Sequence, residues 1–157
     1  MFIKRGCLFE LQTKFAYSHT YVDGKDSLEE MVIEAIHKGF GSIGFSEHTY
    51  LQYSSFPNQL TNDKIELYKK EIKQLKNKYK DKIDIFCGLE YDFYSEINTD
   101  DFDYLIGSVH YLDCNGNIVT FDRGLPETLD YVNINFDGDG LKFAEKYFET
   151  ATISLEN

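Results

Sequence analysis

The chain has 157 residues, of which 42% are hydrophobic, which is enough for one domain with a buried core. Its formal net charge of −11 argues against binding to a nucleic-acid backbone, which requires a basic surface, although clustered carboxylates can hold cations that attract an anionic substrate. The cysteines Cys7, Cys87 and Cys114 form no CxxC pair, and no apolar run approaches the roughly 20 residues that cross a bilayer. We therefore expect a cytoplasmic protein with neither nucleic-acid nor membrane partners.

The first two-thirds of the chain alternate between strand and helix patterns. Apolar and polar residues alternate over 11–18, and an Asp/Gly-rich turn separates them from an amphipathic helix over 27–38. In that helix His37 follows the apolar stripe, so we expect it at the surface. The remaining elements predicted here are buried strands over 42–46, 83–89 and 103–109, and a long helix over 62–80 with a solvated lysine face. This order predicts an α/β fold with a mainly parallel sheet.

The last third of the chain carries weaker signals. Asn115-Gly116 predicts a hairpin between residues 109–111 and 118–121. Residues 122–139 are expected to be a loop with a short helix after Pro126, followed by an amphipathic helix over 140–150. No element is expected in the final ATISLEN.

Metal-ligating residue types follow three of the predicted strands. They are His48 with Glu47 beside it, Glu90 and His110, and the turn after the first strand adds His19 and Asp23. Because the carboxyl ends of parallel strands meet at one edge of a sheet, these side chains are predicted to converge. Imidazole together with carboxylate suits Zn, Mn or Fe better than Mg or Ca. The alternative for each residue is a structural role at a strand end.

The stretches that hold these residues are HTYVDGKDSLEEMV, IGFSEHTY, GLEYDF and DYLIGSVHYL. They resemble, in order, four motifs of the PHP (polymerase and histidinol phosphatase) family, especially its histidinol-phosphatase branch, from about Tyr17 to Phe148. The resemblance implies a distorted (β/α)7 barrel, up to three divalent metal ions and hydrolysis of a phosphate monoester such as L-histidinol phosphate in histidine biosynthesis. It also implies metal ligation by His19, Asp23, His48, Glu90 and His110.

The chain departs from the family pattern at both ends. Tyr17 stands where the family has the first histidine of an HxH motif, and Phe15 stands at a nearby acidic position. No histidine follows His110, so the later Gly-His and Asp-x-His motifs are missing. We therefore expect residues 1–157 to form one PHP-like domain equivalent to the N-terminal portion of the barrel, from a truncated or frame-shifted member.

Two functions remain open from the sequence. The first is a metal-dependent phosphoesterase acting on a small phosphate ester, with Arg123 either contacting the phosphate or serving a structural role. The second is a catalytically impaired remnant that binds metal or forms a homo-oligomer through surfaces left open by an incomplete barrel.

Overall fold

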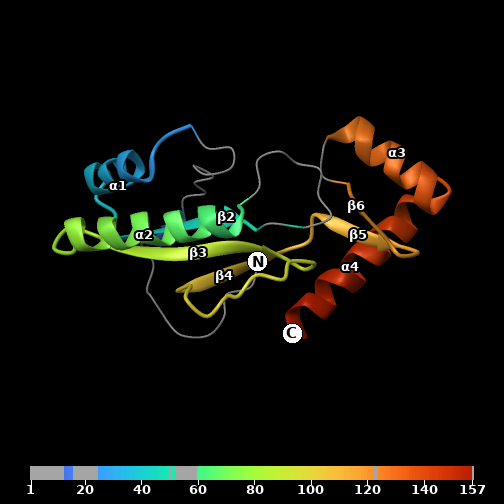
Figure 1. Ribbon diagram of the computed structural model, residues 1–157. Helices are drawn as coiled ribbons and strands as arrows, with labels where there is room; N and C mark the ends of the chain where they lie inside the picture. Colours follow the sequence, from blue (N-terminus) through green and yellow to red (C-terminus); the bar gives the residue numbers. More distant parts are fainter. Residues whose placement is uncertain (1–12, 16–24, 50, 52–59, 122–123, 157) are drawn as a thin grey trace.

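The computed structural model describes residues 13–15, 25–49, 51, 60–121 and 124–156 (Figure 1). In chain order its elements are β1 (Thr13–Phe15), α1 (Leu28–His37), β2 (Ser42–His48), α2 (Asn62–Tyr79), β3 (Asp84–Asp92), β4 (Tyr104–Ser108), β5 (Tyr111–Cys114), β6 (Asn117–Thr120), α3 (Leu125–Phe136) and α4 (Gly140–Glu156).

The first four strands form a parallel sheet in the order β1-β2-β3-β4. Ser42 pairs with Asp84 at the start of the β2–β3 ladder, and His48 pairs with Glu90 at its end. Helices α1 and α2 supply the crossovers from β1 to β2 and from β2 to β3, whereas residues 93–103 connect β3 to β4 without a helix. The predicted α/β fold with a mainly parallel sheet is thus confirmed. The described strands make an open sheet with β1 and β4 at its edges, so closure into a barrel stays a prediction.

Helices α1 and α2 lie on the same side of this sheet (Figure 1). Helix α1 begins at a capping box, in which Ser27 and Glu30 satisfy each other's backbone N–H groups. The core on this side consists of alternate strand residues and the inner stripes of both helices, among them Leu28, Val32, Ile43, Phe45, Tyr68, Ile72, Ile85 and Cys87. Because side chains alternate along a strand, the residues between these core positions face the opposite side of the sheet.

On that opposite side, one tyrosine ring spans two neighbouring strands. Tyr104 of β4 lies over Gly44 and Gly88, and a Cβ atom built on Gly88 would come within 2.3 Å of the ring. The phenol hydroxyl donates to the carbonyl oxygen of Phe45 at 2.9 Å and lies 2.7 Å from the Ser46 hydroxyl. The two glycines therefore provide the space in which a buried ring can cross the sheet.

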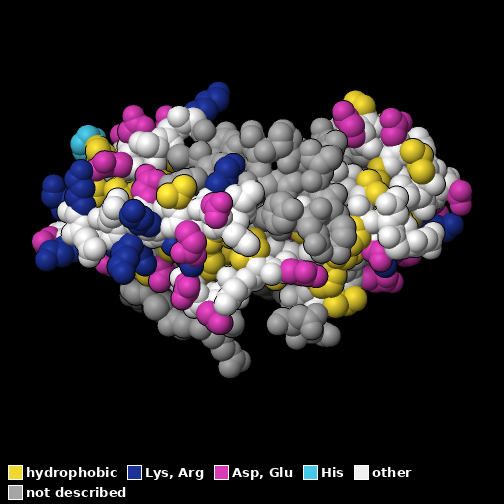
Figure 2. All heavy atoms as spheres, in the orientation of Figure 1, with side chains coloured by type: hydrophobic (Ala, Val, Ile, Leu, Met, Phe, Trp, Pro, Cys, Tyr) yellow, Lys and Arg dark blue, Asp and Glu magenta, His cyan; other side chains and the backbone are white. Residues whose placement is uncertain are grey.

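The outer surface of α2 is a network of ion pairs. Lys69 pairs with Glu66 and Asp101. Lys76 pairs with Asp103, and Lys78 pairs with Glu29. Figure 2 shows Lys and acidic side chains interleaved over this end of the molecule. The predicted solvated lysine face is confirmed.

Beyond β4 the structure differs from the prediction. The Asn115-Gly116 hairpin is present, with φ values of 57° and 82° that suit its two-residue turn, and it joins β5 to β6. The helix predicted after Pro126 is present but longer than expected, because α3 runs for 12 residues with Pro126 in its first turn and occupies most of the predicted loop. The prediction of an unstructured tail was wrong, because α4 continues to Glu156.

Helices α3 and α4 pack against each other, and α4 also contacts β4 and β5. Both helices leave large apolar side chains at the surface: Leu125, Leu129, Ile134, Leu141, Phe148 and Ile153. Hydrophobic side chains are visible at this end of the molecule in Figure 2. Among the described residues, no helix has both the length and the hydropathy needed to span a membrane.

Candidate metal centre

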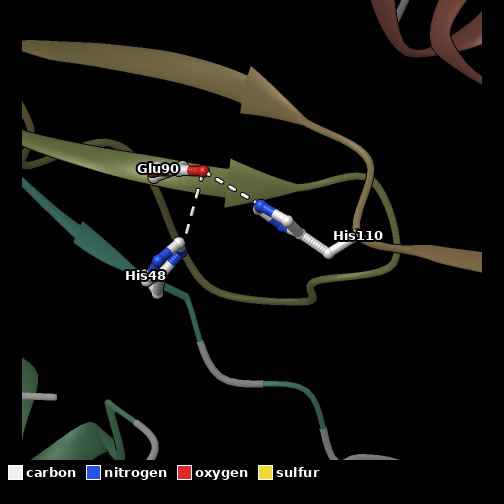
Figure 3. A group of neighbouring side chains, drawn as sticks. All are labelled: His48, Glu90 and His110. Atoms are coloured by element: carbon white, nitrogen blue, oxygen red, sulfur yellow. Dashed lines mark ion pairs between the residues drawn. The ribbon is translucent and has the colours of Figure 1, made fainter. Parts of the chain in front are cut away.

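Three side chains meet at the carboxyl end of the parallel sheet (Figure 3). His48 is the last residue of β2, Glu90 is its direct neighbour in β3, and His110 follows the end of β4. The β2–β3 register places His48 beside Glu90, and the β3–β4 register brings the end of β4 alongside the same part of β3. The predicted convergence therefore follows from parallel pairing in these registers.

One carboxylate oxygen lies between the two imidazoles. Glu90 Oε1 lies 3.1 Å from His110 Nε2 and 3.7 Å from His48 Nδ1. The rings of His48 and His110 are 5.3 Å apart and nearly perpendicular. One ligand atom from each of the three residues lies within 4.8 Å of the others. Atoms bound to one Zn²⁺ at about 2.0–2.2 Å are separated by up to roughly twice that distance, so small adjustments would let these three share an ion.

The donor set also fits a metal by its chemistry. Two imidazoles and a carboxylate are typical ligands of Zn, Mn and Fe in proteins. The side chains of Glu90 and His110 are 12% and 25% exposed, and that of His48 is 34% exposed. The cluster is thus sheltered by the sheet but open enough for an ion and a small ligand to reach it.

A fourth residue, Asp92, holds His110 from the side away from Glu90. Its Oδ2 atom accepts a hydrogen bond from the His110 backbone N–H at 2.8 Å and lies 3.2 Å from the ring Nδ1. Burial lowers the pKa of His110, but hydrogen bonds and charge from Asp92 and Glu90 outweigh burial and raise this pKa to about 10. In the metal-free chain, His110 is therefore a cation held between two carboxylates.

Asp92 was missed from the sequence, although a signal was present. It follows Glu90 by two residues, and residues two apart in a strand share a face. The predicted strand ended at Leu89, whereas β3 continues to Asp92. A second missed residue is Ser108, which pairs with Asp92 across the ladder. Its Oγ atom is buried and has no hydrogen-bond partner within the described part of the chain.

The other predicted site residues fall outside this cluster or outside the described residues. Glu47 is completely buried, and strand alternation directs it to the opposite face from His48. His37 is exposed in the last turn of α1, as predicted. His19, Asp23 and Arg123 lie outside the described residues, so their predicted roles stay predictions.

Because a metal would compete with the proton on His110, binding should depend on pH. Ligation through Nε2 requires a neutral ring, whereas the raised pKa keeps metal-free His110 protonated at pH 7. We expect Zn²⁺ binding at pH 7 to release about one proton from His110 and to weaken as pH falls. Calorimetric titration in buffers of different ionisation enthalpy measures the number of protons released on Zn²⁺ binding. A binding enthalpy independent of the buffer would contradict the prediction.

Comparisons of sequence and of structure both match this chain to histidinol phosphatases. The histidinol-phosphatase of Lactococcus lactis subsp. lactis is 35% identical over 114 residues, covering 68% of this chain and 40% of the relative. The solved structure of histidinol phosphate phosphatase from the same organism, complexed with Zn, L-histidinol and phosphate, matches with a TM-score of 0.54 and 26% identity, covering 79% of this chain and 51% of that one.

A structure of a candidate histidinol phosphatase from Listeria monocytogenes matches with a TM-score of 0.57 and 21% identity, covering 74% of this chain and 50% of that one, and supports the fold. The chain thus spans 40% of the curated relative and about half of the two solved chains. The PHP domain family model matches residues 2–155. Since this match extends over nearly the whole chain, the protein belongs to the PHP domain family.

Proposed function

We propose that the chain is a metal-dependent phosphoesterase of the histidinol-phosphatase kind, acting on a small phosphate monoester. The observation that carries this proposal is the cluster of His48, Glu90 and His110 at the carboxyl end of the sheet in a PHP-domain chain. L-Histidinol phosphate is the first substrate to test, because a related structure contains L-histidinol and phosphate together with Zn. This substrate would give the protein a place in histidine biosynthesis.

In this proposal Glu90 is the central ligand, flanked by His48 and His110, and the ion is Zn, Mn or Fe. A divalent metal, when bound, polarises the phosphoryl group and lowers the pKa of a coordinated water. The residues of the chain fix the position of the ion against the strand ends.

The same proposal extends to the parts that sequence alone predicts. Residues 1–157 would form one PHP domain corresponding to the N-terminal portion of a distorted (β/α)7 barrel. His19 and Asp23 would add ligands, and Arg123 would pair with the phosphate. A cytoplasmic location and the absence of a nucleic-acid partner remain part of the proposal.

A second candidate function is a metal-binding or dimerising module with impaired catalysis. The large apolar side chains exposed on α3 and α4 favour it, because exposed apolar surface is used in protein association. The departures at Tyr17 and Phe15 favour it as well, since a neutral phenol is a poor metal ligand.

The experiment is a phosphate-release assay on the purified chain with Zn²⁺, Mn²⁺ or Fe²⁺, using an aryl phosphate and L-histidinol phosphate. We expect metal binding with hydrolysis well below that of the Lactococcus relative, and Tyr17→His should improve metal retention without restoring full turnover. Binding without any hydrolysis would favour the module. Failure to bind any of these ions would reject both the phosphoesterase and its metal site.

A further inference from the structure

Asp92 is an acidic residue that the fold almost completely buries. It is the last residue of β3 and is 2% exposed. An ionised carboxylate is costly to bury unless hydrogen bonds and nearby positive charge compensate it. Its position two residues beyond Glu90 places it on the same face of the sheet as the proposed metal ligands.

Three contacts to the Asp92 carboxylate compensate its burial, and the Asp92 backbone N–H makes a fourth hydrogen bond. Oδ2 accepts from the backbone N–H of His110 at 2.8 Å and faces the ring Nδ1 at 3.2 Å. Oδ1 accepts from the backbone N–H of Tyr94 at 3.0 Å. The backbone N–H of Asp92 itself donates to Thr49 Oγ1 at 3.0 Å. Both carboxylate oxygens are thus engaged by groups in fixed parts of the backbone.

The contact with Thr49 links Asp92 to the end of β2, the strand that carries His48. Thr49 directly follows His48, and its backbone N–H donates to the carbonyl oxygen of Glu90 at 3.0 Å. Asp92 therefore touches the segment carrying His48, belongs to the strand carrying Glu90, and holds His110. Replacing the Asp92 side chain removes the contacts that hold His110, while the backbone contact to Thr49 and the pairing of β2 with β3 remain, so it changes the placement of His110 relative to the other two ligands without removing any ligand.

We propose that Asp92 is the positioning residue of the metal centre. By accepting from Nδ1–H, Asp92 keeps the proton on that nitrogen, so Nε2, which faces Glu90 Oε1 at 3.1 Å, is the ring atom left to bind a metal. Because the same Oδ2 atom also accepts from the His110 backbone, the ring is held relative to its own main chain. This inference rests on the proposed metal site and deepens it.

The test compares Asp92→Asn and Asp92→Ala with the unaltered protein in Zn²⁺ competition against a chromophoric chelator. Loss of a group that orients a metal-binding histidine typically costs 10–100-fold in affinity, and we expect losses of about that size, larger for Ala. Asp103→Asn is the matched control, because Asp103 also accepts from a backbone N–H, that of Cys87, and pairs with Lys76, but precedes β4 at the other end. The control should leave Zn²⁺ affinity unchanged.

A double-variant comparison separates positioning from general destabilisation. If Asp92 acts through His110, then Asp92→Asn should weaken Zn²⁺ binding much less in a His110→Gln background than in the unaltered protein. The visible spectrum of bound Co²⁺ should change with Asp92→Asn and not with Asp103→Asn. Equal losses in both backgrounds, or unchanged affinity and spectrum, would overturn the inference.

A measurement on metal-free protein separates this inference from the proposed function. Hydrogen exchange of the His110 backbone N–H and the resonance of its Nδ1–H report the Asp92 contacts directly. In Asp92→Ala both His110 protons should exchange faster with solvent, while the backbone amides of β2 and β3 keep their protection. If that variant does not fold, Asp92→Asn provides the same comparison for Nδ1–H. A chain that binds no metal yet shows these losses would reject the metal site but retain the contact, whereas unchanged protection would reject the positioning role.

Discussion

Replacing Glu90 with Ala should abolish retention of a divalent metal, a larger loss than any other single change in the described part of the centre. Glu90 Oε1 is the atom shared by the contacts to His48 and His110, so its removal leaves two imidazoles without the carboxylate between them. Loss of a direct ligand should exceed the 10–100-fold effect of losing an orienting group, so we expect affinity to fall by more than about 100-fold. Elemental analysis after gel filtration, with Zn²⁺ titration, measures this loss.

Glu96→Ala provides the control for the change in charge. Glu96 lies in the segment that follows β3, and its side chain is exposed. The Glu96→Ala substitution should therefore leave the metal content and the metal affinity unchanged. Glu90→Ala protein that keeps the metal content of the unaltered chain would show that the ion binds elsewhere, and hydrolysis persisting in that variant would exclude Glu90 from the active site.

Substituting Gly88 with Ala should destabilise the sheet by about 3 kcal/mol, near the upper end of the usual cost of overpacking. The added Cβ would lie 2.3–2.6 Å from three ring atoms of Tyr104. The ring cannot move away freely, because its hydroxyl is hydrogen-bonded to the Phe45 carbonyl and lies beside the Ser46 hydroxyl. Urea unfolding followed by circular dichroism gives the change in the free energy of unfolding.

Gly107→Ala is the matched control within the same sheet, because a Cβ at Gly107 would meet nothing within 4 Å. We expect it to be neutral or slightly stabilising, since alanine loses less backbone entropy than glycine on folding. Truncating the ring should relieve the clash, so the cost of Gly88→Ala should shrink in a Tyr104→Ala background. Equal effects of the two glycine substitutions would disprove the steric argument.

The parallel half of the fold was predictable because each of its signals was local. Short apolar runs predicted β2, β3 and β4, the first two of them after an amphipathic helix, and the polar residues after these runs predicted which strand ends lie together. The proximity of His48, Glu90 and His110 was predictable because the strands are parallel and adjacent, so that residues at corresponding strand ends become neighbours in space.

The remaining features depend on contacts that no short sequence pattern contains. The apolar residues of α3 do not form one clear stripe, since Leu125, Leu129 and Ile134 are exposed while Tyr131 and Val132 are buried. The end of α4 contains β-branched residues with low helix propensity, yet it continues the helix. The spacing of Asp92 from Glu90 indicated a shared face of the sheet, but its role depends on a contact with His110, which lies beyond the next strand.

The parallel register also determines when the centre can form during folding. His48, Glu90 and His110 belong to segments that are far apart in the chain, and each pairing closes a long loop before its contacts compensate the lost entropy. The three ligands therefore meet only after both ladders have reached their final register. Metal bound at this place would act mainly on the rate of unfolding, because its contacts are absent until the sheet is nearly complete.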